Sequence, residues 1–223
     1  MKIIAHRGYS ARYTQNTLIA FEKAIEAGVY GIEIDLRLSS DEELIIFHDD
    51  NLKNLSGLDK APEELSLSQL KELNIGDKQK IASLNELLNL ADAKVKLILE
   101  IKFNIDTYKK LCEKINFNIK DKIEWVEVSC FEDKVLEYMN NLNPKIKLHK
   151  LIDNASILKD KNFKKKYKYI SYFDINIKLK NIVSQLSLFE KHKIIFWTVE
   201  NEDISKEKDA GLYAIMKDNP QIN

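Results

Sequence analysis

The sequence is short of several materials that particular classes of protein require. Its 223 residues include only six glycines, three prolines and two cysteines, and 35 basic residues are balanced by 35 acidic ones. A formal net charge of zero removes the long-range field on which nucleic-acid binders and proteins of anionic membranes usually depend. We therefore expect no nucleic-acid partner, and a polyanionic ligand has to be held by local groups.

Two further absences concern compartment and domain organisation. No uninterrupted apolar run approaches the ~20 residues that cross a bilayer, and the apolar residues before His6 are too few for a signal-peptide core. These absences predict a cytoplasmic protein. Because glycine and proline are too scarce for a flexible linker, we expect one domain over residues 1–223. Cys112 and Cys130 lack the Cys or His neighbours of a zinc site, so we interpret both as small apolar residues.

Arginine is also scarce, since it occurs only at positions 7, 12 and 37 among 35 basic residues. Lysine is therefore the default surface charge of this chain. A planar guanidinium can hold two oxygens of a phosphate or carboxylate at once, which a lysine ammonium cannot do. The bias against arginine favours a specific role for the three that are present.

What the chain does contain is a regular alternation of short β-branched runs with amphipathic helical stretches. Such an alternation predicts a parallel sheet with right-handed crossovers, and eight units close a (β/α)8 TIM barrel. An open doubly wound sheet is the competing architecture, but no Gly-rich phosphate loop follows the first strand. The predicted strands are Lys2–Ala5, Gly31–Leu36, Val95–Ile101, Trp125–Ser129, Ile146–Leu151, Tyr169–Phe173, Ile194–Val199 and Leu212–Met216.

One connection is unusually long, because about 59 residues separate the second predicted strand from the third. We expect a short insertion over about residues 38–82 that carries an extra strand, Leu44–Phe47, followed by His48 and Asp49. Long excursions of this kind tend to be functional. We expect this one to carry groups over the site or to recognise the substrate.

Polar residues gather where the predicted barrel strands end, which is where such barrels carry their active sites. Glu33 and Asp35 point to one face of their strand because side chains alternate with period two. Glu100 is expected beside them. Carboxylates that share a confined space need a cation or protons, and oxygen ligands suit Mg²⁺ or Ca²⁺ better than zinc. The clusters are His6-Arg7-Gly8, Glu33 with Asp35, His48-Asp49, and Glu100 with Lys102.

Each of these residues also has a purely structural interpretation. Glu33 and Asp35 fit a solvated strand face about as well as a metal site, and a lone strand-end histidine is more often structural than catalytic. In the same sense, Arg7 fits an ion pair, Asn16-Thr17 a helix N-cap, Glu100 with Lys102 a surface pair, and Asp49 with Asp50 a turn.

Three further features are assigned to structure or to solvent. His149 and His192 lie among lysines, and we interpret them as solvated or structural. The run Lys164–Lys166 between two aromatic residues could touch lipid headgroups, but a charge run is usually a solvated helix face. We therefore do not favour membrane contact.

Taken in order, the strand-end motifs resemble those of the glycerophosphodiester phosphodiesterase family. That family has a His-Arg-Gly strand end, an Asn-Thr ten residues after the His, Glu-x-Asp, His-Asp and Glu-x-Lys. Here these are His6-Arg7-Gly8, Asn16-Thr17, Glu33-Ile34-Asp35, His48-Asp49 and Glu100-Ile101-Lys102. Weaker similarities follow in Ser129-Cys130-Phe131, Trp197-Thr198-Val199 and Lys217-Asp218-Asn219-Pro220, so the resemblance covers nearly the whole chain.

The resemblance implies hydrolysis of a glycerophosphodiester, a small-molecule substrate, to sn-glycerol 3-phosphate and an alcohol. It implies one divalent cation, Mg²⁺ or Ca²⁺. In this sequence the cation would be held by Glu33, Asp35 and Glu100. His6 and His48 would act as acid and base, and the substrate-binding residues would be Arg7, Lys102 and Trp197.

Two rivals remain open, and two departures from the family pattern motivate the second of them, the barrel without catalysis. Gln15 stands where the family has Glu, and Lys217 where it has Thr. Gln15 can accept a hydrogen bond but cannot form an ion pair. One rival is the same chemistry on a lipid, of the lysophospholipase D or sphingomyelinase D type. The other is a barrel that binds phosphoesters without catalysis.

Overall fold

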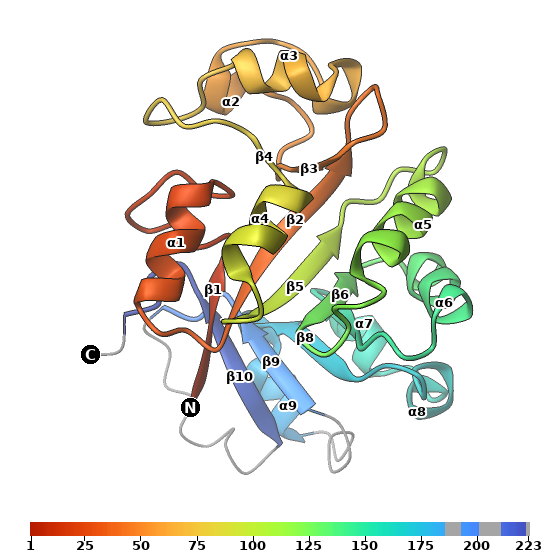
Figure 1. The fold of residues 1–223 in the computed structure, drawn as a ribbon. Helices are drawn as coiled ribbons and strands as arrows, with labels where there is room; N and C mark the ends of the chain where they lie inside the picture. Colours follow the sequence, from red (N-terminus) through yellow and green to blue (C-terminus); the bar gives the residue numbers. More distant parts are fainter. Residues whose placement is uncertain (186–192, 201–210, 222–223) are drawn as a thin grey trace.

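Eight parallel strands form a closed ring in the computed structural model, which describes residues 1–185, 193–200 and 211–221. β1 pairs with β2 on one side and with β10 on the other, so the ring has no free edge (Figure 1). The predicted (β/α)8 barrel is confirmed. Its strands are β1 (Lys2–His6), β2 (Gly31–Leu38), β5 (Lys96–Ile101), β6 (Val126–Cys130), β7 (Leu148–Ile152), β8 (Tyr172–Asn176), β9 (Lys193–Trp197) and β10 (Leu212–Lys217).

Helices follow the barrel strands and lie around the ring. In the part of the chain that the structure describes, none of them is long and apolar enough to span a membrane. They are α1 (Leu18–Glu26), α4 (Leu84–Ala91), α5 (Tyr108–Ile119), α6 (Asp133–Leu142), α7 (Ala155–Leu158), α8 (Phe163–Lys166), the 3-10 helix η2 (Ile177–Leu179) and α9 (Lys180–Gln185).

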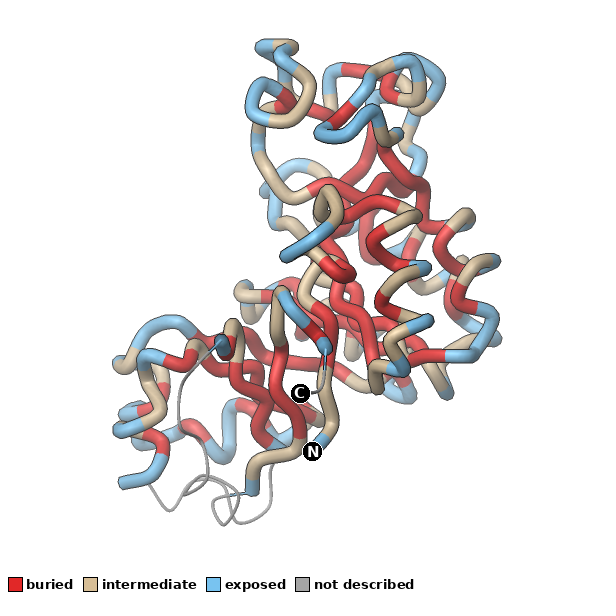
Figure 2. The backbone as a smooth tube through the Cα atoms, turned by 90° about the vertical axis from the view of Figure 1, so that its left-hand side faces the viewer, coloured by how far each residue is buried: buried red, intermediate tan, exposed pale blue. Residues whose placement is uncertain are grey.

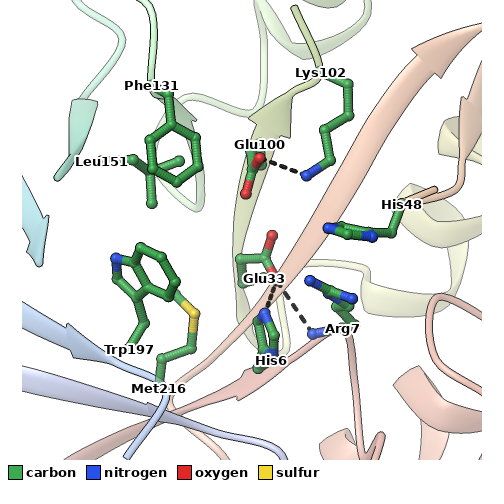
Figure 3. Close-up of a pocket in the computed structure, with 10 residues that line it drawn as sticks. All are labelled: His6, Arg7, Glu33, His48, Glu100, Lys102, Phe131, Leu151, Trp197 and Met216. Atoms are coloured by element: carbon green, nitrogen blue, oxygen red, sulfur yellow. Dashed lines mark hydrogen bonds and ion pairs between the residues drawn. The ribbon is translucent and has the colours of Figure 1, made fainter. Parts of the chain in front are cut away.

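The two faces of β2 show how the sequence alternation divides the barrel. Ile32, Ile34 and Leu36 pack in the outer core with side chains of the surrounding helices. The intervening Glu33 and Asp35 are also buried, and Glu33 lines a cavity at the mouth of the ring (Figure 3). Asp35, two residues along the strand, shares its face. Burial of the apolar face against helices thus forces two carboxylates into the barrel.

The segment between β2 and α4 has a small core of its own. β3 (Leu44–Ile46) pairs antiparallel with β2, and β4 (Ala82–Ser83) pairs with β3. Figure 1 shows α2 (Lys53–Ser56) and α3 (Leu67–Glu72) beyond the C-terminal end of β2, and Figure 2 shows buried residues within this part of the chain. The 3-10 helix η1 (Pro62–Glu64) lies between them. The cluster contains Ile45, Phe47, Leu52, Leu65, Leu70, Ile75 and Ile81.

Arg37 ties this segment to β2. Its Nη1 donates to Glu63 Oε1 at 2.8 Å, its Nη2 donates to the main-chain oxygen of His48 at 2.9 Å, and it also pairs with Asp50. One of the three arginines therefore holds two carboxylates and a carbonyl. The Arg37 guanidinium therefore fixes the main chain at His48, just after β3.

A second group of charges lies inside the ring on β6, β7 and β8. His149 is fully buried, and its Nδ1 lies 3.0 Å from Asp174 Oδ1 while its Nε2 lies 3.0 Å from Glu127 Oε2. Burial alone would lower the pKa of His149, but Asp174 and Glu127 outweigh it and raise that pKa to about 9. The ring is therefore an imidazolium, and a solvated position for His149 is excluded. His192, which we interpreted from sequence as solvated or structural, lies outside the described residues.

Most strand predictions differ from the structure by one or two residues, but β8 begins and ends three residues later than predicted. The predicted strand ends at Phe173, one residue before the charged Asp174. Asp174 continues the strand because His149 on β7 compensates its buried charge. Cys112 and Cys130 are both buried and unpaired, in agreement with an apolar role.

Candidate active site

A cavity of about 150 Å³ lies at the mouth of the barrel, at the C-terminal ends of its strands (Figure 3). One side of it is charged and the other side is apolar. All the candidate site residues predicted from sequence line this cavity except Asp35, which is buried beneath it. The lining residues are His6, Arg7, Glu33, His48, Glu100, Lys102, Phe131, Leu151, Trp197 and Met216.

A tight turn after β1 positions Arg7. Arg7 and Asn16 have left-handed backbones with φ of 57° and 58°, and the Asn16 N–H donates to the Arg7 carbonyl at 3.0 Å. Gly8 follows with φ of 81°, and a Cβ on it would lie 2.8 Å from the Ala20 main chain. Only glycine fits there. The turn places the Arg7 N–H 3.2 Å from Glu33 Oε2.

The three predicted carboxylates converge. Glu33, Asp35 and Glu100 each offer one oxygen, and these oxygens lie within 4.8 Å of one another. β2 and β5 are paired in register, with Asp35 opposite Glu100, which brings the acids together. Glu33 Oε1 is buried and has no hydrogen-bond partner among the described residues. An acceptor in that condition needs a proton or a cation.

Two cations partly balance these acids. Lys102 Nζ lies 2.6 Å from Glu100 Oε1 and 2.8 Å from Asp35 Oδ1, and Arg7 Nε lies 3.3 Å from Asp35 Oδ2. Burial would lower the pKa of Lys102, but Asp35 and Glu100 outweigh it and raise that pKa above its ordinary value. Lys102 is therefore charged throughout the neutral range.

The pKa values of the three carboxyl groups shift in two directions: those of Glu33 and Glu100 are raised, and that of Asp35 is lowered. Burial raises the pKa of Glu33 well above its ordinary value, and the charges of Asp35 and Glu100 raise it further. Burial and the Asp35 charge also raise the pKa of Glu100. Burial acts in the same direction on Asp35, but Lys102 and Arg7 outweigh it and lower its pKa. Burial and mutual repulsion thus favour the protonated forms of Glu33 and Glu100, and a bound cation would favour their charged forms.

Each histidine of the cavity is held at Nδ1 by a carboxylate. His6 Nδ1 lies 2.6 Å from Asp218 Oδ1, and its Nε2 lies 3.9 Å from Glu33 Oε2. His48 Nδ1 lies 2.8 Å from Asp49 Oδ1. Burial lowers the pKa of His48, which keeps its imidazole largely neutral near pH 7. In both residues the arrangement leaves Nε2 for the cavity.

The apolar side of the cavity comes from the ends of β6, β7, β9 and β10. Phe131 and Trp197 meet edge to face with ring centroids 5.9 Å apart, and Leu151 and Met216 complete this side. The Trp197 indole N–H donates to the Asp174 carbonyl at 3.0 Å, which fixes the ring. Figure 3 shows these four side chains opposite Lys102, His48 and Arg7.

Several contacts of the site are not evident from the sequence. Asp218 belongs there only to a weak motif, yet it pairs with His6 across 212 positions. Thr17 is the N-cap of α1, as its structural interpretation predicts. Asn16 does not cap the helix, because its Nδ2 donates to Asp35 Oδ2 at 2.7 Å. Gln15 accepts a hydrogen bond from Arg7 Nη1 at 2.7 Å. Lys217 does not line the cavity.

The fold and the charged cavity define a (β/α)8 barrel with the site at the end where enzymes of this fold perform their chemistry. The model of the glycerophosphoryl diester phosphodiesterase family matches residues 6–222. The chain therefore belongs to that family of enzymes.

Two relatives illustrate the similarity, one that spans nearly the whole chain and one that spans about half of it. The glycerophosphodiester phosphodiesterase of Caldanaerobacter subterraneus subsp. tengcongensis is 28% identical over 98% of this chain and 94% of its own length. The uncharacterized Bacillus subtilis protein YqiK is 34% identical over 135 residues, and the match spans 55% of this chain and 56% of that protein.

Solved structures show the same fold. The structure of a Thermotoga maritima glycerophosphodiester phosphodiesterase superposes with a TM-score of 0.81 at 29% identity, covering 98% of this chain and 95% of that one. An Oleispira antarctica phosphodiesterase in complex with the product sn-glycerol-3-phosphate superposes with a TM-score of 0.82 at 23% identity, covering 99% and 94%.

Proposed function

We propose that this protein hydrolyses glycerophosphodiesters to sn-glycerol 3-phosphate and an alcohol, with one divalent cation and with His6 and His48 as acid and base. The observation that carries the proposal is one cavity lined by two of three convergent carboxylates, by a guanidinium and by two carboxylate-held imidazoles. The named activity of full-length relatives and the product bound by a structural neighbour support it.

The acidic cluster fits a hard divalent cation. Glu33 Oε1 is a buried oxygen without a hydrogen-bond partner in the described part of the chain, and the raised pKa values of Glu33 and Glu100 reflect the same lack of compensation. Glu33, Asp35 and Glu100 would hold the ion. An all-oxygen donor set favours Mg²⁺ or Ca²⁺. A bound cation would supply positive charge to the phosphate as phosphorus becomes five-coordinate.

Arg7 and Lys102 provide the remaining positive charge for the phosphate. Both line the cavity, and each is anchored by Asp35 rather than free to swing. Preorganised cations of this kind stabilise charge that develops on phosphate oxygens without reorganisation during the reaction. The apolar side, including Trp197, contacts the carbon atoms of the glycerol.

The two imidazoles divide the proton transfers. A glycerol hydroxyl of the substrate attacks phosphorus, the bond to the alcohol oxygen breaks, and that oxygen takes a proton from one imidazolium while the other imidazole accepts the hydroxyl proton. Water then opens the cyclic diester with the roles reversed, which restores both histidines. Asp218 and Asp49 orient the two rings for these transfers.

The dimensions of the cavity favour a small diester over a lipid. A space of about 150 Å³ accommodates a glycerol phosphate, whereas an acyl chain on the glycerol would need the apolar side to continue as a groove. The paired imidazoles favour catalysis over simple phosphoester binding, since binding alone requires no such pair.

The decisive experiment measures glycerol 3-phosphate released from a panel of glycerophosphodiesters after chelation and after addition of Mg²⁺ or Ca²⁺. We expect no release without metal and recovery on addition. Glu33→Gln, His6→Ala and His48→Ala should each lower kcat by at least about a hundredfold.

Phe117→Ala, a change at a surface residue that is 70% exposed, is the control and should leave kcat unchanged. Equal release by wild type and Glu33→Gln would refute the metal assignment. Activity that survives His6→Ala would refute the catalytic pair.

A further inference from the structure

One buried hydroxyl inside the barrel has no hydrogen-bond partner, and the proposed mechanism does not use it. Ser129 is 1% exposed, and its Oγ makes no hydrogen bond within the described part of the chain. Such a group is uncommon in proteins, because burial of a hydroxyl is costly unless another polar group replaces its hydrogen bonds to water. The unpaired Oγ therefore indicates a partner that is not part of the protein.

The alternation of side chains along β6 turns Ser129 into the ring. Val128 and Cys130, on either side of it in the sequence, pack in the outer core. Ser129 therefore shares the inner face of β6 with Glu127, which holds His149. Since the mouth of the barrel lies at the C-terminal ends of the strands, Ser129 is the nearer of these two β6 residues to the candidate site.

The register between strands places Ser129 beside the acidic cluster. Ser129 on β6 is the register partner of Glu100 on β5, and Glu100 is in turn the register partner of Asp35 on β2. Both of these acids contribute an oxygen to the cluster. Neighbouring strands lie about 4.8 Å apart, so the hydroxyl is one strand spacing from an acid that we expect to hold the cation.

The register partners on both sides of Ser129 already have other partners. His149 on β7 has both of its ring nitrogens hydrogen-bonded to carboxylates. Glu100 on β5 accepts a hydrogen bond from Lys102 Nζ at 2.6 Å through Oε1. The acidic cluster itself contains an unpaired buried acceptor, Glu33 Oε1, within the described structure. An unpaired hydroxyl and an unpaired carboxylate oxygen thus occur in the same part of the barrel.

We propose that the Ser129 hydroxyl helps to hold the divalent cation through a hydrogen bond to a water molecule on the ion. This inference rests on the proposed function and extends the cation site beyond its three carboxylates. Three carboxylate ligands leave about three positions of an octahedral ion for water and substrate. A hydroxyl can donate to such a water or accept from it, and contacts of this kind change metal affinity by about 10- to 100-fold.

A contact made through water favours Mg²⁺ over Ca²⁺. Mg²⁺ keeps several waters in a nearly ideal octahedron, whereas Ca²⁺ takes more oxygen ligands in a flexible arrangement. A hydroxyl fixed on a barrel strand therefore assists the ion whose waters have fixed positions more than the ion whose ligands rearrange. Ser129 thus adds a selectivity that three carboxylates alone do not determine.

The test measures the Kd of Mg²⁺ and of Ca²⁺ by calorimetric titration of metal-free protein. Ser129→Ala should raise the Kd of Mg²⁺ about tenfold and that of Ca²⁺ by less than about threefold. Cys130→Ala is the matched control, because it shortens the next side chain of the same strand on the outer face. Both Kd values should stay within about twofold of wild type in this control.

Two further measurements separate this role from a purely structural one. Removal of a hydroxyl without a partner loses no hydrogen bond, so the urea midpoint of the metal-free protein should not fall in Ser129→Ala. The Mg²⁺ concentration for half-maximal release of glycerol 3-phosphate should rise about tenfold, with kcat at saturating Mg²⁺ within about twofold of wild type. A clear fall of the metal-free midpoint would identify a structural hydroxyl and overturn the proposal.

The outcomes distinguish this inference from the proposed function. Failure of wild type to bind either metal would refute the metal assignment of the proposed function and this inference with it. Metal binding by wild type that Ser129→Ala leaves unchanged would refute only the inference. An equal loss of affinity for Mg²⁺ and Ca²⁺ would overturn the contact through water and the selectivity that follows from it.

Discussion

Two groups of buried charges lie in the same barrel, and they differ in how they are compensated. Around His149, an imidazolium lies between Glu127 and Asp174, and each ring nitrogen has a carboxylate partner. Around Glu33, three carboxylates converge on one point and a buried oxygen of Glu33 has no hydrogen-bond partner in the described structure. Glu127 Oε1 is also buried without a hydrogen bond, but Lys147 Nζ lies 3.4 Å from it, so that carboxylate has positive charge on both sides. In the second group three carboxylates share two cations, Arg7 and Lys102.

This difference separates a structural network from a binding site. Both groups lie on adjacent strands, and both contain acids that burial would disfavour. Burial raises the pKa of Glu33 well above its ordinary value, whereas His149 and the lysines near Glu127 outweigh burial and lower the pKa of Glu127. A raised pKa of a buried carboxyl group indicates that the protein does not fully compensate its charge. A lowered pKa indicates that cationic groups of the protein already do so.

The largest expected effect is on stability. His149→Leu leaves Glu127 and Asp174 buried without their cation, so the free energy of unfolding should fall by about 3–5 kcal/mol. His48→Leu, at the half-exposed site histidine, should change it by less than about 1 kcal/mol while activity is lost. Urea denaturation of both variants checks this contrast. A similar loss of stability in both would remove the distinction between the two groups.

The dependence of stability on pH should identify the same network. The folded pKa of His149, about 9, lies above its ordinary value of 6.5, so its contribution is full below pH 6.5 and is lost as pH rises through 9. That shift corresponds to about 3 kcal/mol. The stability difference between wild type and His149→Gln should shrink over this range in denaturation curves. A constant difference from about pH 6.5 to 10 would contradict the imidazolium assignment.

Metal should stabilise the protein through the site alone. At a concentration about a hundred times its Kd, Mg²⁺ or Ca²⁺ should raise the free energy of unfolding by about 2.7 kcal/mol. Glu33→Gln should abolish this gain, and Glu127→Gln, although less stable, should retain it. Thermal unfolding with and without metal measures both. A gain lost equally in the two variants would place the ion elsewhere.

The smallest effect concerns a positioning residue. Asp218→Asn keeps a hydrogen-bonding group beside His6 but removes the charge, so kcat should fall about tenfold, or about 1.4 kcal/mol, with KM within about threefold. Steady-state kinetics against Ser10→Ala, which removes a neighbour of Asp218 but not its charge, provide the comparison. An unchanged kcat in Asp218→Asn would show that this carboxylate does not assist His6.

Local patterns in the sequence predict the barrel and place two acids on one face of β2, and the ordered strand-end motifs are needed to favour a site there over a solvated face. Period-two alternation in β2 places Ile34 outside and Asp35 inside, and burial of the outer face leaves little choice. The ends of strands are harder to predict where a charge intervenes. Asp174 resembles a strand end because nothing near it in sequence can compensate its charge.

Contacts between distant positions cannot be predicted in this way. The partner of Asp174 is His149 on the neighbouring strand, and the partner of His6 is Asp218 at the other end of the chain. Neither pairing leaves a periodic signal, because each depends on the register between strands rather than on the sequence of one strand. The role of Arg37 cannot be predicted from sequence for the same reason, because its partners lie in the folded segment between β2 and α4.

The pairing of β1 with β10 has a consequence for synthesis. A ribosome delivers Asp218 212 positions after His6, and the imidazole meets this acidic partner only when β10 docks beside β1. Nascent chains that have not yet produced β10 therefore lack the carboxylate partner of His6. Under the proposed function, turnover reports that the whole ring has closed.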